Sequence, residues 1–366
     1  MALQVGIVGL PNVGKSTLFN ALTSAKAEAA NYPFCTIDPN VGVVMVPDPR
    51  MDQITSFIQP KSVIPTAMEF VDIAGIVKGA SQGEGLGNQF LSHIRQTDAI
   101  VHVVRCFDDP NIIHVAGSVD PLRDMEIINT ELMLADLDSV EKKLKRVEKA
   151  AKSTTDKKLK MEFEVTQKLY EALSKGLPAR SVTLDELEEP FRKDLHLLTS
   201  KPVLYACNVS DTDFSAGGNE WVTDVQKRAQ EEGNKSLMIC SAMEAEISQL
   251  DKAEQKEFLA SMGAEEPALH RLIREAYQLL GLQTYFTAGE KEVRAWTIRA
   301  GTKAPQAAGV IHTDFEKGFI RAETYHCKDL FQYKSEAAVK EAGKYRVEGK
   351  EYVVQDGDIL FFRFNV

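Results

Sequence analysis

The sequence lacks any long apolar run. No stretch reaches the roughly 18 apolar residues that a membrane-spanning helix needs. The longest runs, such as residues 99–104, have the length of buried strands. The first residues also lack the basic stretch, apolar core and small-residue cleavage site of a signal peptide. We therefore expect neither a membrane span nor a membrane partner.

Cysteine is scarce and never clustered. The five cysteines contain no C-x-x-C pair and no zinc-finger spacing. They stand singly at Cys35, Cys106, Cys207, Cys240 and Cys327. This pattern argues against a disulfide framework and is typical of reduced thiols. We therefore expect a cytoplasmic protein.

Positive charge is in deficit, with 43 Lys plus Arg against 53 Asp plus Glu and a formal net charge of −10. This balance argues against a dedicated nucleic-acid wrapper, although a basic face on an acidic body remains compatible with it. The 44% apolar and 26% charged residues are ordinary globular composition, which excludes disorder and collagen for the whole chain. A length of 366 residues predicts two or three domains.

Short apolar runs alternate with helical stretches and Gly/Pro loops, which predicts an α/β fold with a mainly parallel sheet covered on both faces. The expected strands are residues 3–8, 41–46, 67–71, 99–104, 203–207 and 237–240. We assign residues 1–281 to this α/β domain. Residues 282–366 form a small β-rich unit, with strands expected at 292–298, 352–354 and 359–364.

An insertion at about residues 125–200 interrupts the strand rhythm. Its apolar positions follow a 3-4 spacing on both sides of the polar turn at 152–157, which predicts an antiparallel helical hairpin. Residues 139–175 hold 11 Lys plus Arg against 6 Asp plus Glu, a net charge of +5. The hairpin is either a basic contact surface or a solvated helix pair with incidental lysines.

The strongest motif is G-L-P-N-V-G-K-S at residues 9–16, which matches the phosphate-binding pattern G-x-x-x-x-G-K-[ST] between a strand and a helix. In this pattern, loop N–H groups bind phosphate oxygens, Lys15 meets the β- and γ-phosphates, and the Ser16 hydroxyl ligates Mg²⁺. We assign Lys15 a catalytic role as well. The predicted nucleotide-binding residues here are Asn12, Val13, Gly14, Lys15, Ser16 and Thr17.

A second motif supports a nucleotide switch. Asp72 ends a strand-like run and begins D-x-x-G, with Gly75 as its glycine. Asp72 would hold Mg²⁺ through water, and the Gly75 N–H would meet the γ-phosphate. Thr36 lies between the first helix and the second strand, where a threonine completes the Mg²⁺ ligands when a γ-phosphate is bound. The predicted metal residues are therefore Ser16, Thr36 and Asp72.

A third segment, N-V-S-D at residues 208–211, follows an apolar strand where a P-loop GTPase would place its base-reading N-K-x-D. Asp211 can accept the N–H groups of guanine, whereas Val209 replaces the lysine whose stem covers the base. Ser241 and Ala242 follow the last strand and are similar to the S-A segment that closes a base pocket.

Together these segments resemble the YchF branch of the Obg-like ATPases, within the translation-factor class of P-loop GTPases. Further strings carry the resemblance: N-Y-P-F-C-T at 31–36, D-I-A-G-I-V-K-G-A at 72–80, G-E-G-L-G-N-Q-F at 83–90, Q-T-Y-F-T-A-G at 283–289, E-V-R-A-W-T-I at 292–298 and I-H-T-D-F-E-K-G-F-I at 311–320. The resemblance implies a P-loop NTPase domain with a helical insertion, a C-terminal TGS domain and association with ribosomes. We expect the large subunit and ribosomal RNA as partners.

The resemblance also implies ATP in preference to GTP, with Asn208 bonding the adenine edge. One departure keeps GTP open, because the family usually carries Glu where this chain has Asp211. Asp211 supplies the carboxylate of N-K-x-D that accepts the guanine N–H groups, whereas the lysine of that motif is absent.

Hydrolysis is expected to be slow. Apolar Ile76 stands where many GTPases carry the glutamine that orients water. The resemblance assigns catalysis to His114, although a lone histidine beside Ile and Val is often a packed residue. His93 is a weaker rival, and Lys78 with residues 79–87 are expected switch elements.

Two functions fit these residues. The first is a ribosome-associated ATPase switch, and the second is a ribosome-binding adaptor with incidental hydrolysis. A metabolic kinase is disfavoured, because the sequence contains no motif for a second substrate.

Overall fold

The computed structural model describes residues 3–24, 40–75, 79–82, 86–153 and 155–365. The chain divides into two compact units, Met1–Val44 with Glu69–Leu272, and Met45–Met68 with Ile273–Val366. Among the described residues, no helix has both the length and the apolar character needed to cross a membrane.

The first unit contains a six-stranded sheet in the order β2-β4-β1-β5-β6-β7. The strands are β1 (Gln4–Val8), β2 (Val41–Met45), β4 (Ala67–Asp72), β5 (Ala99–Arg105), β6 (Val203–Asn208) and β7 (Lys235–Ile239). β1 pairs in parallel with β4 and β5, β5 with β6, and β6 with β7. Every residue of β5 and β6 is buried, as expected for strands covered on both faces.

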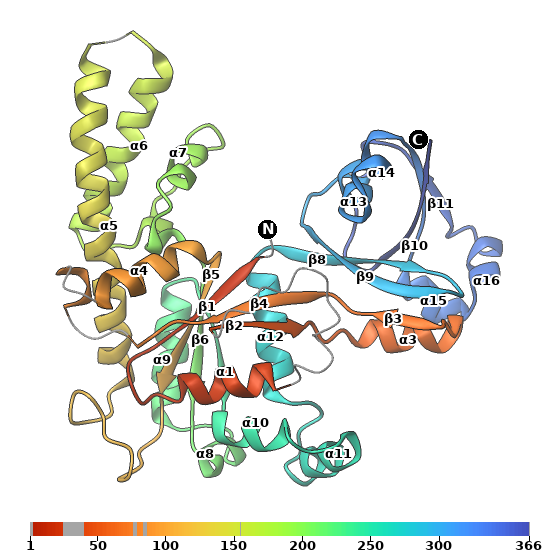
Figure 1. Ribbon diagram of the computed structural model, residues 1–366, viewed down its shortest axis with the longest axis horizontal. Coiled ribbons are helices and arrows are strands. Elements are labelled where there is room, and N and C mark those ends of the chain that lie inside the picture. The colour runs from red at the N-terminus through yellow and green to blue at the C-terminus, as the bar shows by residue number, and fades with distance from the viewer. Residues whose placement is uncertain (1–2, 25–39, 76–78, 83–85, 154, 366) are drawn as a thin grey trace. The chain divides into compact units, whose positions relative to one another are not determined.

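Helices and short 3-10 turns connect these strands (Figure 1). They are α1 (Lys15–Thr23), η1 (Ala80–Gln82), α4 (Leu86–Gln96), α5 (Pro121–Lys152), α6 (Lys157–Ser174), η2 (Ala179–Ser181), α7 (Glu189–Asp194), η3 (Leu198–Ser200), α8 (Asp211–Ser215), α9 (Glu220–Glu231), α10 (Ser241–Ile247) and α11 (Lys252–Ser261). Helix α12 (Ala268–Leu279) runs from the first unit into the second.

The predicted helical hairpin is confirmed, with α5 and α6 side by side in Figure 1. Its interior is an apolar cluster that includes Val140, Val165 and Leu169. Lys143 and Glu162 form an ion pair between the two helices. The 3-4 spacing of apolar residues therefore places one stripe of each helix against the other.

The second unit contains a six-stranded sheet in the order β11-β10-β12-β8-β9-β3. The strands are β3 (Ser62–Ile64), β8 (Leu282–Ala288), β9 (Glu292–Arg299), β10 (Phe319–His326), β11 (Arg346–Glu348) and β12 (Asp358–Phe364). The helices are α3 (Pro49–Ile58), α13 (Ala304–Ile311), α14 (Thr313–Lys317), α15 (Cys327–Tyr333) and α16 (Glu336–Glu341). Residues 352–354, expected as a strand, form only an isolated bridge between Val353 and Lys303.

Residues 45–68 pack in the second unit, although our division of the chain placed them in the first. The reason is a long-range pairing, because β3 runs parallel to β9 with Ser62 opposite Glu292. Met51 and Ile54 of α3 also lie in an apolar cluster with Phe286. We keep the proposed domain boundary after residue 281. The contacts of residues 45–68 add this earlier segment to the second unit.

Candidate functional site

The phosphate-binding motif forms the loop between β1 and α1. β1 lies between β4 and β5, so the loop is at the carboxyl edge where open α/β sheets bind ligands. Gly14 has a φ of 90°, and a Cβ there would lie 2.2 Å from Nδ2 of Asn208. The glycine is therefore required both by the backbone and by the available space.

Lys15 and Ser16 meet Asp72 across the sheet edge. The Lys15 Nζ lies 2.7 Å from Asp72 Oδ1, and the lysine is only 8% exposed. The Ser16 Oγ lies 3.4 Å from Asp72 Oδ2. Hydroxyl and carboxylate oxygens are the ligands that Mg²⁺ takes from proteins, so the predicted pair Ser16 and Asp72 fits this ion.

Gly75 lies against the phosphate loop, because a Cβ there would be 3.3 Å from the backbone nitrogen of Pro11. The third predicted metal residue, Thr36, lies outside the described residues, as do Ile76 and Lys78.

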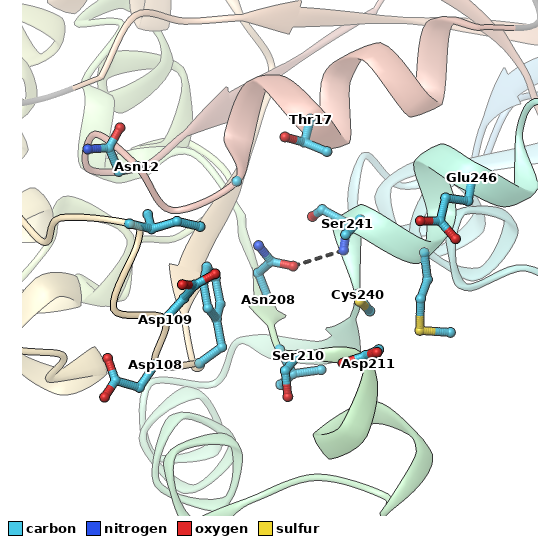
Figure 2. Close-up of a pocket in the computed structure, with 16 residues that line it drawn as sticks. Asn12, Thr17, Asp108, Asp109, Asn208, Ser210, Asp211, Cys240, Ser241 and Glu246 are labelled. Atoms are coloured by element: carbon cyan, nitrogen blue, oxygen red, sulfur yellow. Dashed lines mark hydrogen bonds between the residues drawn. The ribbon is translucent and has the colours of Figure 1, made fainter.

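A pocket of about 660 Å³ opens beside the phosphate loop (Figure 2). Of the predicted residues, Asn12, Gly14, Thr17, Asn208, Asp211, Ser241 and Ala242 line it. Val13, within the loop, is buried. The phosphate loop and the segments 208–211 and 241–242, which are far apart in the sequence, therefore face one cavity.

Asn208 uses both ends of its amide within the protein. Its Nδ2 donates to the Val13 carbonyl at 2.8 Å, and its Oδ1 accepts from the Ser241 N–H at 2.9 Å. The second bond is the dashed line in Figure 2. Asn208 therefore ties the phosphate loop to the start of α10, and neither amide atom is turned to an adenine edge in this geometry.

Asp211 and Cys240 lie on the side of the pocket away from the phosphate loop (Figure 2). Asp211 is exposed, and its Oδ1 accepts from the Thr212 N–H at 2.8 Å. Within the described part of the chain, no residue donates to the second carboxylate oxygen, which can therefore meet a base. Burial raises the pKa of the Cys240 thiol, so this sulfur lines the pocket as a neutral group.

His114 is buried, and both of its ring nitrogens have partners. Nε2 lies 2.7 Å from Asp124 Oδ2, and Nδ1 accepts from the Ala116 N–H at 3.0 Å. Its neighbour Ile113 accepts a hydrogen bond from Asn12 of the phosphate loop at 3.1 Å. His114 therefore follows a residue that contacts the phosphate loop, and both of its own ring nitrogens are engaged within the protein. His93 is exposed on α4.

Sequence reasoning missed several residues of the site. The pocket is also lined by Phe107, Asp108, Asp109 and Ile112, which follow β5. Their place directly after a buried parallel strand was a usable signal, since strand ends share one sheet edge. Asp124 gave no such signal, because its contact with His114 depends on how α5 packs.

Two family models match the chain. YchF-GTPase_C, described as "Protein of unknown function (DUF933)", matches residues 282–365, and MMR_HSR1, described as "50S ribosome-binding GTPase", matches residues 4–155. "Ribosome-binding ATPase YchF" of Bacillus subtilis is 59% identical, with 100% of both chains covered. The chain belongs to the YchF family.

Further relatives support this membership. "Obg-like ATPase 1" of Pongo abelii is 47% identical over 100% of this chain and 93% of that protein. The solved Schizosaccharomyces pombe YchF GTPase matches with a TM-score of 0.89 and 44% identity, over 99% of this chain and 98% of that one. The predicted YchF resemblance and the fold class are therefore confirmed.

Proposed function

We propose that this member of the YchF family is a cytoplasmic, Mg²⁺-dependent nucleoside triphosphatase that prefers ATP over GTP and acts on ribosomes. One observation carries the nucleotide part. Lys15, Ser16 and Asp72 converge directly after the phosphate loop, whose residues Asn12 and Gly14 line a pocket large enough for a nucleoside. P-loop NTPases place these residue types at the β- and γ-phosphates.

Different residues of this chain would bind the phosphates and the Mg²⁺ ion. The N–H groups after Gly14 and the N-terminus of α1 would bind phosphate oxygens. Lys15 would exchange its Asp72 partner for the β- and γ-phosphates. Ser16 and Asp72, with Thr36, would hold Mg²⁺, which when bound neutralises charge that develops on the phosphate oxygens.

Slow hydrolysis follows from the restraint on His114. A general base or water-positioning group needs a free nitrogen within hydrogen-bond reach of the water. Both His114 nitrogens are engaged, so His114 has to leave Asp124 before it can act. We infer that a partner supplies this change, which makes turnover conditional.

The ribosome is the proposed partner. The relatives' name, "Ribosome-binding ATPase YchF", and the description "50S ribosome-binding GTPase" both point to it, the latter to the large subunit. The hairpin offers a contact for ribosomal RNA, since Lys142 and Lys145 expose 70% of their side chains.

A GTPase is the second candidate, and it rests on Asp211. This carboxylate lines the pocket with one oxygen available to the two N–H groups of guanine. A ribosome-binding adaptor with incidental hydrolysis remains the third.

Calorimetry with ATP, ADP, GTP and GDP on one preparation, with Mg²⁺ and with EDTA, tests the proposal. We expect tighter binding of ATP than of GTP, weakening in EDTA, and loss of triphosphate binding in Lys15→Ala. Purified ribosomes should raise ATP turnover. Wild-type affinity and turnover in Lys15→Ala would refute the assigned site.

A further inference from the structure

Helix α5 connects three functional regions of the first unit. It is continuous over 32 residues from Pro121 to Lys152, about 48 Å at the usual rise per residue. Its N-terminus is fixed by the Asp120 side chain, which accepts from the Arg123 N–H, and by Pro121 in the first turn. Its C-terminal half is one arm of the basic hairpin.

Glu131, in the middle of α5, binds the backbone that follows the D-x-x-G motif. Its Oε1 accepts from the Gly79 N–H at 2.6 Å, and its Oε2 accepts from the Ser81 N–H at 2.8 Å. The glutamate is only 5% exposed. Two charge-assisted bonds in a buried place hold this segment firmly. Gly79 is four residues after Gly75, the proposed γ-phosphate contact.

Asp124 holds His114 from the same helix. Its Oδ2 lies 2.7 Å from His114 Nε2, and its Oδ1 lies 3.2 Å from the Arg123 guanidinium. The carboxylate is 3% exposed. Asp124 and Glu131 are seven residues apart, so they point from nearly the same face of the helix, two turns from each other.

We propose that Glu131 and Asp124 are positioning residues that let α5 restrain residues 79–81 and His114 together until the hairpin is engaged. A rigid helix cannot shift or rotate at one of these contacts without moving the other. A partner that displaces the hairpin therefore acts on both groups at once. This inference rests on the proposed function, because it explains how a ribosome would accelerate hydrolysis.

The expected direction follows from population shift. If the restrained state dominates without a partner, weakening one restraint raises the fraction of competent molecules. Coupling of this kind is typically about 0.5–2 kcal/mol, which corresponds to a roughly 2- to 30-fold change. The basal rate should rise by this factor, and the stimulation by ribosomes should fall by the same factor. ATP affinity should not change, since neither residue touches the pocket.

Glu131→Gln tests the proposal in the full chain. It keeps the shape and removes one acceptor oxygen and the charge. Glu126→Gln is the matched control, an exposed carboxylate on the same helix. Hydrogen exchange at the Gly79 and Ser81 amides, the ATP dissociation constant, and kcat with and without ribosomes are measured for each. We expect faster exchange, unchanged affinity, a higher basal kcat and weaker stimulation in Glu131→Gln alone.

Three results would overturn the inference. The first is that hydrogen exchange at Gly79 and Ser81 is unchanged in Glu131→Gln. The second is that exchange becomes faster while the kcat and the stimulation by ribosomes equal those of Glu126→Gln. The third is that the basal kcat of Glu131→Gln falls. If Glu131→Gln unfolds, Glu131→Asp withdraws the same carboxylate by one methylene and must give the same pattern. Absence of ATP binding in the wild-type chain would instead refute the proposed function.

Discussion

Asn208 has a structural task that the sequence does not reveal. Its amide bridges the Val13 carbonyl and the Ser241 N–H, and it is only 4% exposed. Removing it would leave two buried backbone groups unpaired, at about 1–3 kcal/mol for such a group. The affinity for any nucleotide would fall, because the hydrogen bonds that connect the phosphate loop to the base side of the pocket would be lost.

Asn208 and Asp211 should therefore differ as variants. Asn208→Ala should weaken ATP and GTP binding alike. Asp211→Ala should weaken GTP roughly 10- to 100-fold, the loss of hydrogen bonds to a charged acceptor, and leave ATP nearly unchanged. Calorimetry with both nucleotides measures this, with the exposed Asp224→Ala as control. Equal, small losses for both nucleotides in Asp211→Ala would show that this carboxylate does not read the base.

At the scale of elements, different residues of the hairpin provide its stability and its surface charge. Its helices are held by the apolar cluster and by the pair Lys143 with Glu162. Lys142 and Lys145 instead pair within α5, with Asp138 and Glu141. Solvent screens such exposed pairs, so they contribute little to stability. The outward lysines can therefore be replaced while the hairpin stays folded.

We expect the hairpin charges to bind ribosomal RNA. Replacing Lys142, Lys145, Arg146 and Lys149 with Gln should weaken ribosome co-sedimentation and flatten its salt dependence, because fewer counterions are released. Lys143 is kept because of its pair with Glu162. The control replaces the exposed Lys193, Lys227, Lys252 and Lys256, which changes the net charge equally. If both variants lose affinity equally, the contact is not specific to the hairpin.

In the second unit, Glu323 of β10 is held by cations. Arg363 of β12 lies 3.1 Å from its Oε1, and Arg321 lies 3.3 Å from the same oxygen. The hydrogen bond from Arg363, with smaller contributions from Tyr345 and Arg321, lowers the pKa of Glu323 from 4.5 to about 2. The folded state therefore favours the ionised carboxylate.

A pH effect on stability follows. Since the folded pKa is below the unfolded one, the contribution of Glu323 is fully present above about pH 4.5 and is lost as the pH falls toward 2. Glu323→Gln should show a shallower loss of stability over this window than the wild type. Urea unfolding in a Trp221→Phe background, in which Trp296 of β9 reports on the second unit, measures it. The same pH slope in both proteins, or a shallower slope in the exposed control Glu341→Gln, would contradict the assignment.

At the scale of the whole molecule, the sequence predicted what short segments encode. The phosphate loop, Asp72 with Gly75 and the hairpin are each defined by spacing within a few tens of residues. The pairing of Ser62 with Glu292 and the contact of Glu131 with Gly79 join distant segments, and no local pattern encodes them. The base pocket lies between these cases, since its segments were predictable but the bridging role of Asn208 required their packing.

Nucleotide binding and ribosome binding should be thermodynamically linked in this chain. If both bind one coupled chain, each must change the affinity for the other by the same factor, commonly about 5- to 150-fold. We expect tighter ribosome co-sedimentation with Mg²⁺-ATP than with no nucleotide, and an ATP dissociation constant lowered by that factor on ribosomes. Lys15→Ala should keep the nucleotide-free ribosome affinity and lose its response to ATP, because the lysine facing Asp72 is needed for triphosphate binding. Identical ribosome affinity with and without ATP would instead identify the chain as an adaptor whose ATP hydrolysis is not coupled to ribosome binding.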